Sequence, residues 1–252
     1  MKLLVKLGGT LLDEDTSRSR LAGELATVSE QLVVVHGGGK QMTRFLAERG
    51  VESKFVGGLR VTTPEVLDAV LKVFAGSVNH QLVAALVAAG CEAVGLSGID
   101  ACLTEAVQWS PELGAVGRPV RSNARLLHVL TDAGYLPVVA CVAGDRQGRI
   151  YNVNADQMAA ACADGFRADR LIFLTDVVGV LDADKRIIPE LSRAASEKLI
   201  ADGVATGGMQ AKLEAAHRAL DGGVPQVCIA PGAEPNVVAR ILAGENIGTR
   251  IC

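Results

Sequence analysis

The sequence predicts an α/β fold, in which a mainly parallel, open central sheet is covered by helices on both faces to give a three-layer α/β/α sandwich. Short apolar runs rich in Val, Ile and Leu recur along the 252 residues, as is typical of buried strands. Segments with a helical period of apolar residues lie between these runs. Because strand and helix alternate along most of the chain, a parallel sheet is favoured over an antiparallel one.

The apolar runs predict strands at residues 3–7, 32–35, 93–96, 136–142, 171–174 and 226–229. Helical periodicity predicts helices at about 21–28, 67–89, 126–130 and 209–220. The longest of these has matching boundary residues, since Thr63 suits an N-cap, Pro64 the first helical position and Gly90 the end. Residues 101–122, with Pro, Gly and mixed polarity, predict an irregular or hairpin insertion. We expect two lobes, 1–168 and 169–252, joined near Ala168.

Composition excludes several classes of protein. With 25 basic and 28 acidic residues and 3% aromatic residues, the chain lacks the basic excess and the stacking surfaces of nucleic-acid binders. The six cysteines are widely spaced and predict neither a zinc site nor a redox pair. The first apolar run is too short for a secretory signal or a membrane span, and we expect that no later segment qualifies as a span by its length and composition. We therefore expect a cytoplasmic protein with reduced thiols.

Ligands of open parallel sheets bind beyond the carboxyl ends of the strands, so the residues that follow each apolar run are candidates for function. Four predicted strands end in polar or glycine-rich turns, at Gly8-Gly9-Thr10, Gly37-Gly38-Gly39-Lys40, Ser97-Gly98 and Thr175-Asp176. Backbone N–H groups of glycine turns can approach phosphate or carboxylate oxygens closely. Glycine is also common in ordinary strand-to-helix turns. The triple glycine leaves a Rossmann oxidoreductase open as an alternative, although neither turn fits the known nucleotide-binding patterns.

Two lysines and one acidic segment stand out. Lys6 lies inside an apolar strand, where its charge needs an anionic partner unless the side chain reaches water from the strand end. Lys212 follows Gly207-Gly208 by one helical turn and is either near a bound anion or an ordinary surface lysine. An alanine-rich helical segment is preceded by Asn152, Asn154 and Asp156. These side chains either bind a substrate or act as helix caps and turn formers. His36 has no visible acidic partner and is interpreted as a structural histidine.

Six blocks of the sequence together resemble the N-acetylglutamate kinases of the amino acid kinase family, in family order along nearly the whole chain. The blocks are Lys6-Leu7-Gly8-Gly9, His36-Gly37-Gly38-Gly39, Gly58-Leu59-Arg60-Val61-Thr62, Asn152-Val153-Asn154-Ala155-Asp156, Leu174-Thr175-Asp176-Val177 and Gly208-Met209-Gln210-Ala211-Lys212. The pairing of Gly-Leu-Arg-Val with Asn-Val-Asn-Ala-Asp is much more specific than any glycine turn. The resemblance implies the amino acid kinase fold, with ATP and Mg²⁺ held mainly by ATP phosphates and water, and it names no metal ligand in the protein.

The resemblance also implies roles for individual residues. Lys6 and Lys212 are expected to stabilise the transferring phosphoryl group, and Asp156 to hold both ammonium groups. Gly8, Gly9, Gly38 and Gly39 form the expected backbone cradle, with Gly8 and Gly9 on the ATP side. Arg60, Asn152 and Asn154 are expected to bind the α-carboxylate and acetamido group of the substrate. The expected nucleotide site in the C-terminal lobe consists of Thr175, Asp176, Val177, Gly179, Val180, Val204, Thr206 and Met209.

The implied reaction is ATP-dependent phosphorylation of the side-chain carboxylate of N-acetyl-L-glutamate, a step of arginine synthesis, by an arginine-insensitive homodimer. Glutamate-like carboxylates are ionised near neutrality, so no general base is needed. One methylene is weakly discriminated, which leaves an acetylated or carrier-linked α-aminoadipate kinase of lysine synthesis as an alternative. A non-catalytic nucleotide-sensing module is the alternative from another class. The segment Ile99-Asp100-Ala101-Cys102 departs from the family pattern, and its role is left open.

Overall fold

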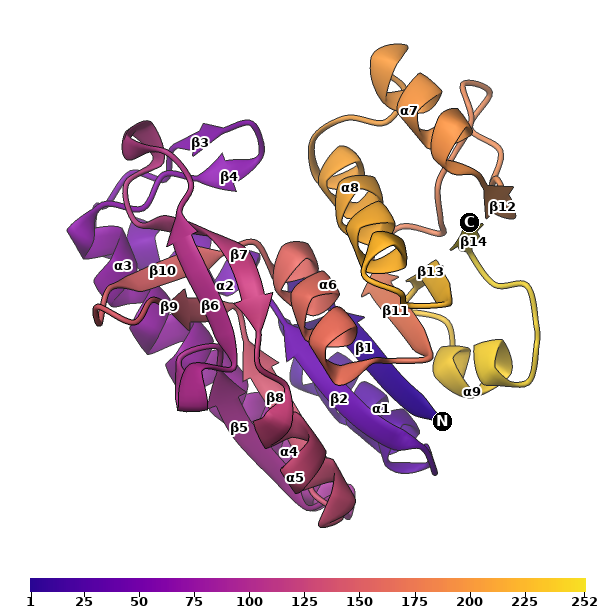
Figure 1. Ribbon diagram of the computed structural model, residues 1–252, viewed down its shortest axis with the longest axis horizontal. Coiled ribbons are helices and arrows are strands. Elements are labelled where there is room, and N and C mark those ends of the chain that lie inside the picture. Colours follow the sequence, from indigo (N-terminus) through magenta and orange to yellow (C-terminus); the bar gives the residue numbers. More distant parts are fainter.

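A computed structural model describes residues 1–252, apart from Gly9, whose surroundings lie outside the described residues. The described chain forms an eight-stranded central sheet in the order β12-β14-β13-β11-β1-β2-β8-β5 (Figure 1). Its strands are β1 (Lys2–Leu7), β2 (Gln31–His36), β5 (Ala93–Ser97), β8 (Leu136–Ala140), β11 (Arg170–Thr175), β12 (Glu190–Leu191), β13 (Gln226–Pro231) and β14 (Thr249–Ile251). Neighbouring strands pair in parallel except β13 with β14. The predicted mainly parallel sheet is thereby confirmed.

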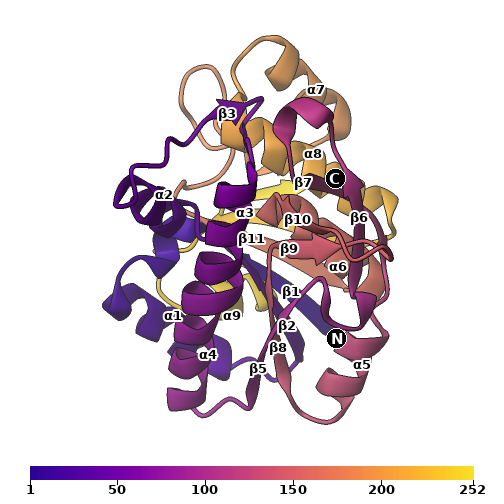
Figure 2. The same ribbon diagram turned by 90° about the vertical axis from the view of Figure 1, so that its left-hand side faces the viewer.

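Helices cover both faces of this sheet. On one face lie α1 (Asp15–Ala26), α4 (Asn79–Ala88) and α9 (Val237–Leu242), and on the other lie α5 (Arg125–Asp132), α6 (Ala155–Phe166) and α8 (Gly207–Asp221) (Figures 1 and 2). Further helices are α2 (Gly39–Ala47), α3 (Pro64–Val70) and α7 (Arg193–Ala201), with short 3₁₀ turns η1 (Gly9–Leu12), η3 (Asp100–Cys102) and η4 (Pro111–Leu113). The three-layer prediction is confirmed, because each helix buries its apolar side against the sheet or a neighbouring helix.

The predicted insertion at residues 101–122 is a hairpin. Strands β6 (Thr104–Gln108) and β7 (Val116–Ser122) pair antiparallel and close a small barrel with β9 (Val142–Gly144) and β10 (Ile150–Val153). The single strand predicted at 136–142 is wrong at its end, since it is interrupted at Cys141. There the chain leaves the central sheet, and the Val142 carbonyl accepts from Gly98 N at 2.6 Å. A short hairpin, β3 (Phe55–Val56) and β4 (Leu59–Arg60), stands beside the barrel.

The longest predicted helix forms as one continuous helical run, Pro64–Ala88 (Figure 2). The predicted cap is present, because the Thr63 side chain accepts from Val66 N at 3.3 Å, and Gly90 has a φ of +95° after the last turn. Its middle part, η2 (Leu71–Val78), is a π-helix rather than the expected α-helix. By length and composition this run is apolar enough to cross a membrane, so the expectation that no later segment qualifies is wrong. Its apolar side packs against the core through Val70, Phe74 and Leu82.

Parallel pairing brings the functional candidates to one edge of the sheet. Strands β1, β2, β5 and β11 all end there, so the polar turns at Gly8, Gly37, Gly98 and Thr175 share that edge, as predicted. Backbone hydrogen bonds join these turns to the neighbouring strands, since Gly8 N donates to Leu174 O at 2.9 Å and Gly37 N donates to Leu7 O at 3.4 Å.

Candidate active site

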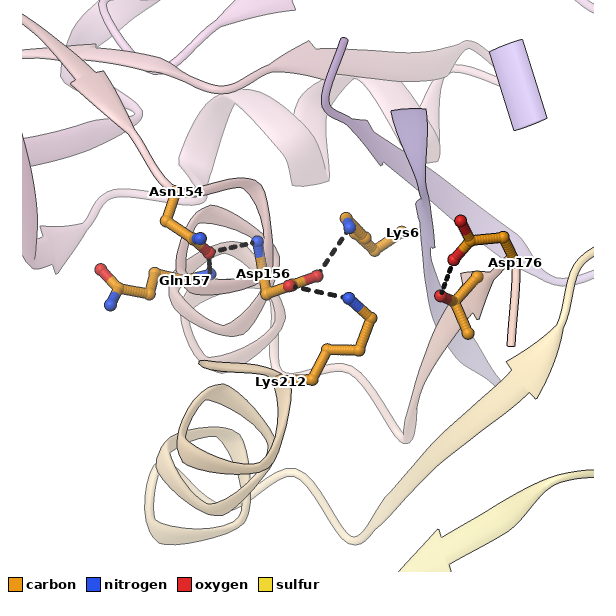
Figure 3. Close-up of polar contacts among 7 residues, drawn as sticks. Lys6, Asn154, Asp156, Gln157, Asp176 and Lys212 are labelled. Atoms are coloured by element: carbon orange, nitrogen blue, oxygen red, sulfur yellow. Dashed lines mark hydrogen bonds and ion pairs between the residues drawn. The ribbon is translucent and has the colours of Figure 1, made fainter. Parts of the chain in front are cut away.

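Two buried lysines converge on one buried carboxylate. Lys6 Nζ lies 2.7 Å from Asp156 Oδ1, and Lys212 Nζ donates to Asp156 Oδ2 at 3.1 Å (Figure 3). Lys6 and Asp156 are each 5% exposed, so neither charge is shared with bulk water. The partner that the sequence demanded for Lys6 is therefore Asp156, and the interpretation of Lys212 as an ordinary surface lysine is excluded by its burial.

Three different elements position these side chains. Lys6 lies on β1, between β2 and β11, so its backbone is bonded on both sides. Asp156 lies in the first turn of α6, where the side-chain oxygen of Asn154 accepts from Asp156 N at 2.9 Å and from Gln157 N at 3.2 Å (Figure 3). Lys212 comes from α8, which begins after Thr206. The predicted capping role of Asn154 is present, and it fixes the helix turn that carries Asp156.

The charges of this cluster depend on each other. Burial disfavours the ionised form of Asp156, but the two lysines outweigh it and lower the pKa of the carboxyl. Burial lowers the pKa of Lys212, and the nearby charge of Lys6 lowers it further, while Asp156 and Asp176 act in the opposite direction. Two ammonium groups against one carboxylate leave a net charge of about +1 on the three groups, at their ordinary ionisation states. Such a cluster attracts an anion to the edge of the sheet.

The glycine turns are needed for close approach. A Cβ at Gly38 would lie 2.9 Å from the ring of Phe74, and a Cβ at Gly8 would lie 3.2 Å from the carbonyl oxygen of Leu174. At Gly39, by contrast, a Cβ would meet nothing within 4 Å, so that side of the turn is open. Gly9, expected to contact ATP, lies outside the described residues. The turns therefore combine tight packing with an open approach to the backbone of α2's first turn.

A hollow beside the turns brings the expected substrate residues together: Gly38, Gly39, Arg60, Asn152 and Asn154 all line it. Arg60 is 8% exposed, and burial lowers the pKa of its guanidinium below the ordinary value. Its guanidinium bonds to Ser53 Oγ, to Thr43 Oγ1 at 2.9 Å and to Gly39 O at 3.2 Å, under the ring of Phe55. These contacts hold the guanidinium as a fixed cation on the wall of the hollow.

The expected nucleotide residues lie at the end of β11 and in the loop after it, just before α8, and in the first turn of α8. The Thr175 hydroxyl donates to Asp176 Oδ1 at 3.1 Å, at the end of β11. Val177 is 39% and Val204 is 38% exposed, so both can contact a bound molecule. Val180 is buried and its N–H donates to Thr249 Oγ1 at 2.8 Å, so that donor is already used within the protein. Gly179 is packed against the same residue, since a Cβ there would lie 2.9 Å from Thr249 Oγ1.

His36 is tied into the protein, as interpreted from the sequence. Its Nδ1 donates to Gly37 O at 2.8 Å, and its Nε2 accepts from Asn79 Nδ2 at 3.0 Å. Burial lowers the pKa of His36 to about 4, so the ring is neutral near pH 7. The second proton of the Asn79 amide goes to Val138 O at 2.9 Å. Asn79 thus links the long helix to two strands beside the site, a role that no local sequence pattern indicated.

A large parallel sheet with a cationic cluster and glycine turns at the carboxyl ends of its strands provides the anion-binding edge that a small-molecule kinase requires. The model of the amino acid kinase family matches residues 1–231. The chain belongs to the amino acid kinase family.

Relatives within the family agree with the resemblance predicted from the six sequence blocks. The chain is 66% identical over 254 residues to the acetylglutamate kinase of Solibacter usitatus (strain Ellin6076), covering 100% of this chain and 99% of the relative. It is 40% identical to the acetylglutamate kinase of Rhodospirillum centenum (strain ATCC 51521 / SW), covering 99% of this chain and 87% of the relative.

Among solved structures, an N-acetylglutamate synthase from Neisseria gonorrhoeae, in complex with coenzyme A and N-acetyl-glutamate, has a TM-score of 0.86 and 26% identity. The match covers 99% of this chain and 59% of that one. The predicted fold and the predicted resemblance to acetylglutamate kinases are confirmed.

Proposed function

We propose that the chain catalyses ATP-dependent phosphorylation of the side-chain carboxylate of N-acetyl-L-glutamate, giving N-acetyl-L-glutamyl 5-phosphate for arginine biosynthesis. The observation that carries this proposal is the contact of Lys6 and Lys212 with the single buried carboxylate of Asp156, at 2.7 Å and 3.1 Å. Full-length identity of 66% to an acetylglutamate kinase supports the choice of substrate.

In the proposed reaction, an oxygen of the substrate carboxylate attacks the γ-phosphorus of ATP. The bond from that phosphorus to the β–γ bridging oxygen breaks, and ADP leaves with the electron pair. The nucleophile is already ionised near neutrality, so the protein need not remove a proton. Lys6 and Lys212 offset the repulsion between two anions and stabilise charge in the transition state, while Asp156 keeps both ammonium groups in place.

The rest of the site divides between the two substrates. Arg60 pairs with the α-carboxylate, and Asn152 binds the acetamido group, since both line the hollow beside the glycine turns. The nucleotide is bordered by the residues at the end of β11 and the start of α8. These are Thr175, Asp176, Val177, Gly179, Val180, Val204, Thr206 and Met209. The exposed side chains of Val177 and Val204 can cover its base. Among the described residues, no group of three His, Cys, Asp or Glu side chains could hold a metal. Mg²⁺ would be held mainly by ATP oxygens and water, where it would neutralise phosphate charge.

The proposal extends to the organisation of the enzyme. We infer an acetyl-amino-acid lobe at 1–168 and an ATP lobe at 169–252, with the site between them. The long apolar run Pro64–Ala88 supports a homodimer, because only 39% of its most apolar stretch is buried inside the chain. Localisation in the cytoplasm and the absence of nucleic-acid partners remain predictions from composition.

The experiment measures ADP release from Mg-ATP with N-acetylglutamate, N-acetyl-α-aminoadipate, glutamate, aspartate and UMP offered in parallel, with hydroxylamine to trap any acyl phosphate. We expect turnover on N-acetylglutamate together with a trapped hydroxamate. A preference for the longer acid would keep the mechanism and overturn the substrate. Nucleotide binding without turnover on any of these substrates would overturn the proposed function and leave a carrier-linked substrate or a sensing module.

A further inference from the structure

Thr62, which no role has claimed so far, is buried behind the substrate hollow. It is 1% exposed, and its hydroxyl is shared between two groups: Thr62 Oγ1 donates to Arg60 O at 2.8 Å and accepts from Asn152 Nδ2 at 3.0 Å. Both partners belong to residues assigned to the substrate. A threonine hydroxyl has a single proton, so donation to the Arg60 carbonyl leaves it only as an acceptor toward Asn152.

The backbone around Thr62 fixes this geometry. Thr62 N donates to Leu113 O at 2.9 Å, and Ala115 N donates to Thr62 O at 2.8 Å. Ala115 O in turn accepts from Asn152 N at 2.9 Å, so the backbone of one residue, just before β7, holds both Thr62 and Asn152. Gly114 permits the contact, since a Cβ there would lie 2.3 Å from Thr62 O. The two side chains are thus held face to face by rigid neighbours.

We infer that Thr62 is a positioning residue that sets the orientation of the Asn152 side-chain amide and thereby makes the hollow selective for a substrate that presents an N–H, as the acetamido group does, over one that has an ester oxygen in its place. Because the Asn152 side-chain NH₂ group donates to Thr62 Oγ1, the side-chain carbonyl oxygen of Asn152 points away from Thr62. That oxygen has no hydrogen-bond partner among the described residues, and Asn152 lines the hollow. A fixed acceptor in a buried site binds a substrate N–H and is left unpaired by a group that lacks one.

This inference rests on the proposed function, and its test uses two substrates that differ at one atom. They are N-acetylglutamate and 2-acetoxyglutarate, the ester in which oxygen replaces the N–H. For the wild-type enzyme we expect kcat/KM to favour the amide by about 10- to 100-fold, the effect of one unpaired buried acceptor. Thr62→Val replaces the hydroxyl by a methyl group in a side chain of nearly the same shape, so the Asn152 amide is free to turn. The ratio of kcat/KM for the amide to kcat/KM for the ester should then fall to within a few fold of one.

Other variants separate positioning from general structure. Thr62→Ser keeps the hydroxyl and should keep the wild-type ratio. Thr131→Val removes another buried threonine hydroxyl, which donates to Leu127 O at 2.9 Å on α5, and should lower the melting temperature without changing the ratio. If Thr62→Val does not fold, Thr62→Ala supplies a second variant without the hydroxyl.

The outcomes are distinct. A wild-type-like ratio in the folded Thr62→Val or Thr62→Ala enzyme, or a lost ratio in Thr62→Ser, overturns the inference while leaving the proposed function intact. A wild-type enzyme that is inactive on N-acetylglutamate overturns the proposed function instead.

Discussion

The side chains of Lys6, Asp156 and Lys212 form a unit in which each charge is buried against the others. Removal of one member therefore changes more than one contact. Substitutions of the two lysines are expected to differ in how much they disturb the folded protein. Lys6 is enclosed by strands on both sides, whereas Lys212 lies on a helix with a side chain 13% exposed. Lys212 is for this reason the better residue for testing catalysis with a folded protein.

Lys212→Ala should lower kcat by about 10²- to 10³-fold with a smaller change in the KM of either substrate, because the ammonium acts on charge that develops in the transition state. Steady-state kinetics at saturating Mg-ATP measures this. Lys198→Ala is the matched control, since Lys198 is exposed and pairs with Asp202 on α7. A Lys212→Ala enzyme with the wild-type kcat would contradict the assigned role.

The lowered pKa of Lys212 also gives a prediction about pH. A lysine loses its positive charge as the pH rises through its pKa, and burial lowers that pKa below 10.5. The kcat/KM for ATP, which reports the free enzyme, should therefore decline on the alkaline side before ordinary lysines titrate. Lys212→Arg should move this decline to higher pH, because a guanidinium stays charged. Superimposable pH profiles for the two enzymes would exclude Lys212 as the titrating group.

At the scale of elements, the π-helix η2 has a specific effect on the site. Its wider turn places Phe74 against the second glycine of the Gly37-Gly38-Gly39 turn, and Phe74 lines the hollow. π-Helical segments inside longer helices are rare and often lie at functional sites. The ring and the glycine turn are thus one packed unit, formed by elements that are distant in sequence.

Gly38→Ala should raise the KM for N-acetylglutamate by about tenfold, because the new methyl pushes the Phe74 ring into the hollow. The double variant Gly38→Ala with Phe74→Leu should recover most of that loss, since the smaller side chain can yield. Gly23→Ala on α1, where a Cβ meets nothing within 4 Å, is the matched control and should leave KM unchanged. Additive effects of the two changes would show that the ring and the turn are independent.

The turn η3 carries backbone strain. Ala101 and Cys102 have φ values of 50° and 53°, in the left-handed region that favours glycine. Ala101→Gly should raise the free energy of unfolding by about 0.5 kcal/mol. The glycine relieves the backbone strain of the folded state, and this gain is partly offset because glycine gives the unfolded chain more conformational freedom. Urea denaturation measures the change. Ala84→Gly, in the exposed side of α4, should shift stability the other way by about 1 kcal/mol.

At the scale of the whole molecule, the neutral His36 makes stability depend on pH. The unfolded histidine takes up a proton as the pH falls through 6.5, whereas folded His36 stays neutral until about pH 4. Stability should therefore fall as the pH is lowered through this window, by about 3 kcal/mol when it is complete. His36→Gln should show a shallower loss in denaturation measured at several pH values. The exposed His80→Gln should match the wild type. Parallel losses in all three proteins would exclude His36 as the source.

The sequence predicted six of the eight strands of the central sheet, because fully buried strands are visible as apolar runs. It missed β12 and β14, which are only two and three residues long. It also predicted that the charge of Lys6, inside an apolar strand, needs an anionic partner, and the family resemblance implied that Asp156 and Lys212 complete the cluster. It did not predict the break at Cys141 or the small barrel, which depend on pairing with residues far along the chain. The π-helix was hidden for a similar reason, because its apolar residues also fit an α-helical period.

The contribution of Thr62 could not have been predicted from its neighbours in sequence. A threonine after Arg60 and Val61 has no distinguishing local pattern, and its role depends on Asn152, 90 residues later. The same is true of Asn79, whose partners lie on β2 and β8. Sequence blocks therefore identified residues that touch substrates more readily than residues that orient them.

The position of β1 in the sheet has a consequence for biosynthesis on the ribosome. The first strand of the chain pairs with β2 on one side and with β11 on the other, so Lys6 faces Phe173 across a separation of 167 residues. Synthesis proceeds from the N-terminus at about 5–20 residues per second. The nascent chain must therefore hold an apolar strand with one open edge for about 10 seconds or more before its second neighbour emerges. An active site that is complete only after α8 has been synthesised is inherent in this order of elements, because α8 carries Lys212.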